Sequence, residues 1–181
     1  MDDPQHDLPE VVTLLTTAST PEVQQAAIGR FFAPDAGLNH PLCKVERAPG
    51  SRDIILGIYQ WYRILSPVVK LQVDSHFYDP DSQTAFVGVT QTFKLWFTPL
   101  PGRPAKLLVR LTLEERSNKH YIIQQEDFYE PEDLAYLVWP PLGFVIRMAK
   151  FGASAASNAG AWAVQNTLGW WKPKYGPLHK E

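Results

Sequence analysis

Residues 67–129 of this 181-residue chain read PVVKLQVDSHFYDPDSQTAFVGVTQTFKLWFTPLPGRPAKLLVRLTLEERSNKHYIIQQEDFY, and nearly all of them fit a series of consecutive strands. Apolar and polar side chains alternate along each run, which is the period-two pattern of strands with one buried face. Turn-forming residues separate the runs at 79–82, 99–104 and 116–119. The stretch therefore predicts four long strands, and neighbours joined by short turns normally pair antiparallel.

The alternation also assigns the side chains of each strand to one of two faces. The faces expected to line the core comprise, in chain order, Val69, Leu71, Val73, Phe77, Ala85, Val87, Val89, Gln91, Phe93, Leu95, Phe97, Leu107, Val109, Leu111, Leu113, Tyr121, Ile123, Gln125, Asp127 and Tyr129. A register error of one residue would reverse any of these faces.

Composition limits the kinds of partner that the chain can have. The formal charge is -2 and no stripe of Lys and Arg is present, so nucleic-acid binding is not expected. Cys43 is the only cysteine, which excludes an intramolecular disulfide and favours a reducing compartment. The acidic start of the chain lacks the apolar core of a signal peptide. A cytoplasmic location is expected, with membrane association as the open alternative, and no metal or cofactor is expected.

The residues before the strands predict helices and one broken strand. An apolar-spaced segment occupies 8–15, and Thr20 followed by Pro21 marks the start of a helix that runs to about residue 32. Residues 38–45 form a short strand that Pro41 interrupts. After residues 49–51, apolar side chains recur at helical spacing, which predicts a second helix with one face toward the core.

The order helix, broken strand, helix and bent antiparallel sheet resembles the nuclear-transport-factor-2-like superfamily, also described as SnoaL-like or ketosteroid-isomerase-like, over roughly residues 21–133. The sequence QEDFY at 125–129 looks like the last strand of that superfamily. The sequences HPLC at 40–43 and QEDFYEPEDL at 125–134 are similar to its fungal SigF-like branch. The resemblance implies an α+β fold, in which helices pack into the concave face of a curved antiparallel sheet to form a cone.

The resemblance leaves activity open. The superfamily contains ketosteroid isomerases, scytalone dehydratases, limonene epoxide hydrolases and polyketide cyclases, together with many binding modules that catalyse nothing. Fold therefore does not decide whether this chain is an enzyme.

Asp127 is the first candidate for chemistry, because its predicted face is otherwise largely apolar. Gln125, Gln91 and Tyr121 are its expected hydrogen-bonding neighbours. A desolvated Asp has a raised pKa and can act as a general acid or base on a small hydrophobic molecule. The alternative is that Asp127 caps the helix after residue 131 or pairs with a surface cation.

His40 is the second candidate, since a histidine in a broken strand can point toward the mouth of the cone. Imidazole titrates near neutrality, and Asn39 beside it is placed to orient a carbonyl or hydroxyl group. Dehydratases and cyclases of the superfamily often use such a pairing of His with Asp. The alternative is that His40 satisfies a local backbone carbonyl. Cys43 is interpreted as a small buried hydrophobic residue.

Aromatic side chains are expected in the wall of the predicted pocket. Tyr59, Trp61 and Tyr62 follow one another on the second predicted helix, and Phe93 lies on the second strand of the sheet. These side chains serve either as ligand contacts or simply as core packing.

Residues 134–181 extend beyond the expected cone domain of residues 1–133 and are predicted to be helical. The apolar stretch from 134 to 148 contains Pro140, Pro141 and Arg147 and is followed by Lys150, which excludes a membrane-spanning helix. The later part of the extension contains Trp162, Trp170, Trp171, Lys172 and Lys174. Two interpretations stay open: these side chains pack on the domain or on a second subunit as a homodimer, or they lie at a membrane surface.

The expected function is binding of a small hydrophobic molecule in an apolar pocket. If the chain is an enzyme, it is expected to catalyse isomerase, dehydratase or cyclase chemistry on that molecule. The alternative is a non-catalytic lipid-binding or peripheral membrane module. The two differ in whether Asp127 and His40 meet at one cavity.

Overall fold

The computed structural model describes residues 1–99 and 101–173, and it shows an α+β fold. Its elements follow in the order α1 (Pro4–Thr17), α2 (Pro21–Phe31), β1 (Phe32–His40), β2 (Cys43–Val45), α3 (Ser51–Leu65), β3 (Lys70–Asp79), β4 (Thr84–Phe93), β5 (Arg103–Arg116), β6 (Lys119–Tyr129), α4 (Pro131–Val138) and α5 (Pro140–Thr167). The chain separates into two compact units, and the second begins at Ala135.

Local sequence signals start each of the first helices. The Thr20 hydroxyl accepts a hydrogen bond from the Val23 N–H at 3.3 Å, and Pro21 opens α2 as predicted. Asp3 caps α1 in the same way. Gly50 precedes α3 with a φ of 82°, a left-handed conformation that favours glycine. The capping residues therefore determine where these helices begin.

The sheet contains six strands in the order β2-β1-β6-β5-β4-β3. The four strands predicted from residues 67–129 are confirmed as β3 to β6, and each pairs antiparallel with its sequence neighbour. The predicted α+β fold with a curved sheet is confirmed, and the sheet is mixed, because β1 pairs parallel to β6. A long stretch of chain separates these two strands, so no hairpin imposes an antiparallel direction on them.

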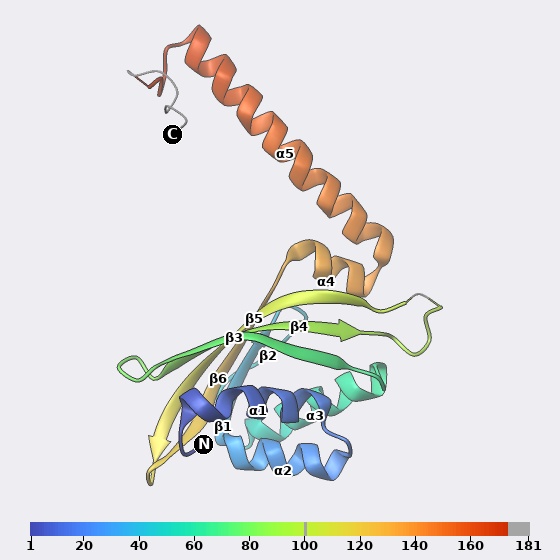
Figure 1. Cartoon of the computed structure of the whole chain (residues 1–181), viewed down its shortest axis with the longest axis vertical. Helices are drawn as coiled ribbons and strands as arrows, with labels where there is room; N and C mark the ends of the chain where they lie inside the picture. The colour runs from blue at the N-terminus through green and yellow to red at the C-terminus, as the bar shows by residue number, and fades with distance from the viewer. Residues whose placement is uncertain (100, 174–181) are drawn as a thin grey trace. The chain divides into compact units, whose positions relative to one another are not determined.

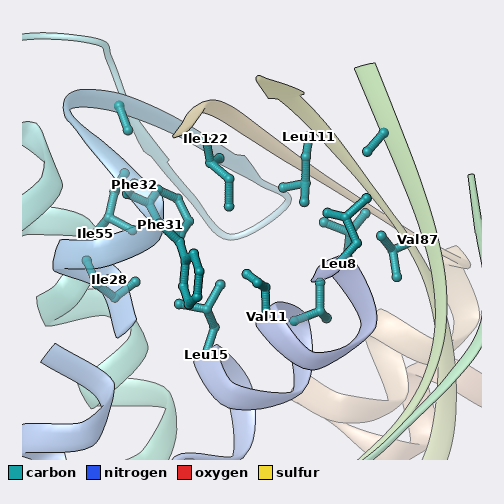
Figure 2. Packing of buried hydrophobic residues seen from close by; sticks show 14 of the residues in the cluster. Leu8, Val11, Leu15, Ile28, Phe31, Phe32, Ile55, Val87, Leu111 and Ile122 are labelled. Atoms are coloured by element: carbon teal, nitrogen blue, oxygen red, sulfur yellow. The ribbon is translucent and has the colours of Figure 1, made fainter. Parts of the chain in front are cut away.

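Helices α1, α2 and α3 lie together on one side of the sheet (Figure 1). Figure 2 shows how side chains from α1, such as Leu8 and Val11, meet Val87 and Leu111 of the sheet. All four are essentially excluded from solvent, and they belong to one continuous hydrophobic core. The helices therefore cover the concave face, and this face contains the interior of the fold.

Two bulges correct the predicted faces of the sheet. The register of β3 shifts between Val73 and Ser75, so Phe77 lies opposite Phe86 and is 60% exposed instead of buried. The register of β6 shifts at Ile123, which leaves Ile122 opposite Leu113 on the inner face. Because a bulge adds one residue to a strand, side chains beyond the bulge point to the opposite face from the one that uninterrupted alternation predicts.

Strand β4 ends earlier than the alternation predicts. Leu95 and Phe97 were expected on its buried face, but the strand stops at Phe93 and Phe97 is exposed. The chain leaves the sheet here because the Lys94 and Trp96 N–H groups donate to the end of α3, at the Ser66 hydroxyl and the Leu65 carbonyl. These bonds fix the end of α3 beside the end of β4.

The bulge in β6 predicts unequal effects of truncating two adjacent isoleucines. Ile122 has no exposed surface, whereas Ile123 is only partly buried against the core. We expect Ile122→Ala to lower the free energy of unfolding by about 3 kcal/mol and Ile123→Ala by less than half of that. Urea unfolding of both variants measures the difference. A larger loss for Ile123→Ala would contradict the position of the bulge.

Candidate functional site

A cavity of about 70 Å³, partly open to solvent, lies between the helices and the concave face of the sheet in the first unit. Helices α1 and α3 and strands β1, β3, β4, β5 and β6 contribute to its wall. Most of the wall is apolar, with Leu15, Ile58, Leu71, Val89 and Val109 among its residues. An apolar pocket with a few polar groups is the usual form of a small-molecule site.

A chain of hydrogen bonds fixes the Asp127 carboxyl group in this wall. Asp127 lies on β6 opposite Val109, so its side chain points to the inner face. The Gln125 amide N–H donates to both Asp127 oxygens, at 2.9 and 3.1 Å. The Tyr59 hydroxyl donates to the side-chain amide oxygen of Gln125 at 2.9 Å. The amide nitrogen of Gln125 is therefore the atom that faces Asp127.

Burial raises the pKa of the Asp127 carboxyl group to about 7, and the Gln125 hydrogen bonds counteract this only in part. Desolvation disfavours the carboxylate, since the surrounding protein solvates a charge less well than water does. The group is therefore close to half-ionised at neutral pH. Such a group can accept a proton in one step and return it in the next.

Neither of the alternatives for Asp127 describes its position. The first turn of α4 contains its own carboxylates, Glu132 and Asp133. Asp127 has no ion pair with any cation in the described ranges 1–99 and 101–173. The Asp127 carboxyl group instead faces the cavity.

His40 ends strand β1 and is buried beside the cavity. The Leu42 N–H donates to its Nδ1 atom at 3.1 Å, so Nδ1 is the unprotonated nitrogen of the neutral ring. The proton then lies on Nε2, which donates to the Tyr62 oxygen at 2.7 Å. The Tyr62 O–H is consequently free to donate to a ligand, and Tyr62 lines the cavity.

Burial lowers the pKa of His40 to about 4, so its imidazole is neutral at neutral pH. Its ring packs edge-on against Tyr62 and Tyr129, with centroid distances of 5.5 and 5.3 Å. An imidazole with this pKa exchanges protons poorly near neutrality. The geometry therefore favours a role in holding Tyr62 over the proton exchange expected of His40.

Most residues expected at the site lie in the wall of this one cavity. These are His40, Tyr59, Tyr62, Gln91, Phe93, Gln125 and Asp127. Gln91 also forms a hydrogen bond to the Tyr129 hydroxyl.

Three other expected residues, Asn39, Trp61 and Tyr121, do not line the cavity. Asn39 is exposed, because it neighbours the inward-facing His40 in an extended strand. Trp61 is 55% exposed, because Ile58, Tyr59 and Tyr62 form the inner face of α3. Tyr121 lies opposite Glu114, on the far side of the bulge from Gln125.

Tyr129 and Arg63 are among the residues of the cavity wall that the sequence did not identify as ligand contacts. Tyr129 was placed on the correct face but not counted among the ligand contacts, although it lines the cavity. Arg63 also lines the cavity, and one arginine in a helix carries no signal that separates it from an exposed one. Cys43 is half-buried, and burial together with the Asp127 charge raises the pKa of its thiol.

The pKa of Asp127 predicts how its removal changes stability with pH. Between about pH 4 and pH 7 the folded state retains a proton that the unfolded state has lost, so this group lowers the free energy of unfolding as pH rises. Asp127→Asn removes that dependence. We expect the variant to gain roughly 3 kcal/mol relative to wild type between pH 5 and pH 8 in urea unfolding.

The comparison with wild type isolates Asp127 from His40. The pKa of His40 is lowered on folding, so its contribution to stability rises with pH between about pH 4 and pH 6.5, opposite in sign to that of Asp127. Both proteins contain His40, so this contribution cancels. Asp81→Asn, at an exposed turn, is the matched control and should keep the wild-type dependence. A difference between Asp127→Asn and wild type that is constant with pH would contradict the raised pKa.

Comparison with known families identifies a match that covers most of the chain. The family model described as the SigF NTF2-like domain matches residues 1–170. No curated protein matches the sequence.

Solved structures share the fold at low sequence identity. A protein with a ketosteroid isomerase-like fold from Catenulispora acidiphila, in complex with trimethylamine, has a TM-score of 0.54 and 15% identity, covering 71% of this chain and 92% of its own. A protein from Jannaschia with the provisional name SnoaL-like polyketide cyclase has a TM-score of 0.54 and 12% identity, covering 71% and 88%. At these identities the likeness concerns the fold alone.

Proposed function

We propose that this chain, which belongs to the SigF NTF2-like domain family, binds a small hydrophobic molecule in the cavity and catalyses acid–base chemistry on it. One observation carries the proposal: the Asp127 carboxyl group faces a largely apolar cavity, forms no ion pair among the described residues, and has a pKa of about 7. Polarity and pKa of this kind are typical of a general acid or base.

The roles of the polar groups follow from their hydrogen bonds. The ionised Asp127 removes a proton from a carbon next to a carbonyl group, and the electron pair moves onto the carbonyl oxygen. The Tyr62 O–H, left free by the His40 Nε2–H, donates to that oxygen. The protonated Asp127 then returns the proton to a second carbon or to a leaving hydroxyl group. This sequence is the common part of isomerisation, dehydration and cyclisation.

Gln125, Tyr59 and His40 act as positioning residues in this proposal. The Tyr59 hydroxyl orients the Gln125 amide, and the amide orients both oxygens of Asp127. His40 orients the Tyr62 hydroxyl in the same manner.

Deuterium exchange into a hydrophobic ketone tests the proposal without knowledge of the substrate. β-Tetralone carries acidic hydrogens next to its carbonyl group, and NMR in D₂O follows their replacement by deuterium. We expect the wild-type protein to accelerate the exchange. Asp127→Asn should reduce the acceleration at least about 100-fold, because the amide cannot accept the proton.

Two controls separate chemistry from folding and from binding. Asp81→Asn introduces the same substitution at an exposed turn and should retain the wild-type exchange rate. Saturation-transfer NMR with β-tetralone reports binding to each protein. Binding without accelerated exchange in wild type would overturn the catalytic role but leave the pocket as a ligand site. Full exchange by Asp127→Asn would remove Asp127 from the chemistry.

A lipid-binding or peripheral membrane module is the second candidate, and the composition of the second unit favours it. The described residues from 135 to 173 contain Arg147, Lys150 and Lys172 but no carboxylate. Large apolar side chains are exposed there, including Phe151 and Trp162. Trp170 and Trp171, close to Lys172, are exposed as well, whereas Lys174 lies outside the described residues. Aromatic and cationic side chains are typical of a protein surface at anionic lipid headgroups.

No described helix is both long enough and apolar enough to cross a membrane, so this candidate concerns the membrane surface. It predicts that the full chain co-sediments with phosphatidylserine vesicles more strongly than with phosphatidylcholine vesicles. Rising salt should weaken the binding, because it screens the cations. Replacing Trp162, Trp170 and Trp171 by Ala should abolish it.

The competing interpretation is that the same side chains pack on protein, either on the first unit or in a homodimer. It predicts that the triple variant aggregates or changes its mass in native mass spectrometry, since buried apolar surface would be lost. A variant that stays folded at the wild-type mass and no longer binds vesicles would favour the membrane surface.

A further inference from the structure

Among the described residues that line the cavity, Arg63 is the one permanent cation. Of the other side chains in that wall that carry charge, His40 is neutral near neutrality and Asp127 is an acid. Arg63 lies in the last turn of α3, where a cation interacts favourably with the helix dipole. The dipole accounts for a basic residue at that position on the helix, but not for a side chain that faces an apolar cavity.

Arg63 also differs from the other arginines of the first unit, because no hydrogen bond or ion pair of its side chain occurs among the described residues. Arg47 and Arg116 pair with Asp35, and Arg110 pairs with Glu126. Arg52 donates to backbone carbonyls, Arg30 lies over the Phe31 ring, and Arg103 has an interaction of its own. Arg63 is half-buried as a residue, and a guanidinium group whose donors have no partner in the protein can bind an anion.

Arg63 and Asp127 contribute to the wall of the cavity from different elements. Arg63 lies in the last turn of α3, and the end of this helix is held beside the end of β4 by the bonds from Lys94 and Trp96. Asp127 lies on β6 opposite Val109. A ligand that contacts both groups therefore extends from α3 to β6.

We propose that the cavity selects an amphipathic carboxylate, with its anionic group bound by Arg63 and its apolar body extending along the sheet toward Asp127. This inference rests on the proposed binding of a hydrophobic molecule and adds the charge and shape of that molecule. A carboxylate fits the planar donors of a guanidinium group in a bidentate manner. The ligand also keeps its negative charge away from Asp127, which would otherwise be driven further toward its protonated form.

Octanoate and 1-octanol form a matched pair of probes, because they share the apolar chain and differ in the charge. Isothermal titration calorimetry of the full chain at pH 7 measures both affinities. We expect octanoate to bind about tenfold more tightly than 1-octanol to the wild-type protein. Arg63→Met keeps the apolar stem without the charge and should reduce that ratio to about one, because the charge that distinguishes the two probes is removed.

Two further variants keep the test independent of folding. Arg63→Lys retains the charge and should preserve a preference for octanoate, reduced because a bidentate contact is lost. Arg30→Met makes the same substitution on α2, away from the cavity, and should keep the wild-type ratio. Thermal melting confirms that each variant is folded.

The outcomes distinguish this inference from the proposed function. Equal binding of both probes to wild type would overturn the role of Arg63 but leave the hydrophobic pocket intact. A preference for octanoate that survives in Arg63→Met would also overturn it. Binding of neither probe to wild type would overturn the pocket as a ligand site, and with it this inference.

Discussion

The position of β6 between β1 and β5 is the constraint on which the interior of the first unit depends. Both edges of this strand are hydrogen-bonded, one in a parallel and one in an antiparallel pairing. A strand held on both sides cannot slip by one residue without breaking two ladders. Gln125, Asp127 and Tyr129 are therefore kept on the concave face, although two of them would be solvated more favourably outside.

The cost of burying these polar groups is offset by a small set of hydrogen bonds among them. Tyr59, Gln125 and Asp127 form one chain, and Leu42, His40 and Tyr62 form another. Each chain ends at a group that faces the cavity, namely Asp127 in the first and Tyr62 in the second. Polar groups of this kind specify one arrangement of the interior, since alternatives would leave a buried group unpaired.

The sequence was sufficient to predict the strands and the inner face of most of them, because alternation over ten residues is a strong signal. It was not sufficient to predict the bulges at residues 74 and 123, since an extra residue in a strand has no compositional mark. For the same reason Tyr121 and Phe77 were assigned to the wrong face. The sequence did not determine which side of α3 faces the core, because Ile54 and Trp61 form a second apolar side of the helix. Both of these side chains are exposed in the structure. The pairing of β1 with β6 depends on contacts between distant parts of the chain, which no local pattern contains.

The bulge at Ile123 divides β6 into two segments, and both differ from the hairpin turn in how they tolerate a change of length. The turn at residues 116–119 can gain or lose a residue without moving Ile122, Gln125 or Asp127, whereas a change just before the bulge would turn the buried Ile122 outward. A single insertion between residues 124 and 129 would instead turn the carboxyl group from the cavity to the outer face. In descendants of this sequence, insertions and deletions should accumulate at the hairpin turn and be eliminated between residues 124 and 129. The length of that segment should therefore stay constant as long as the pocket is used, even where its side chains have changed.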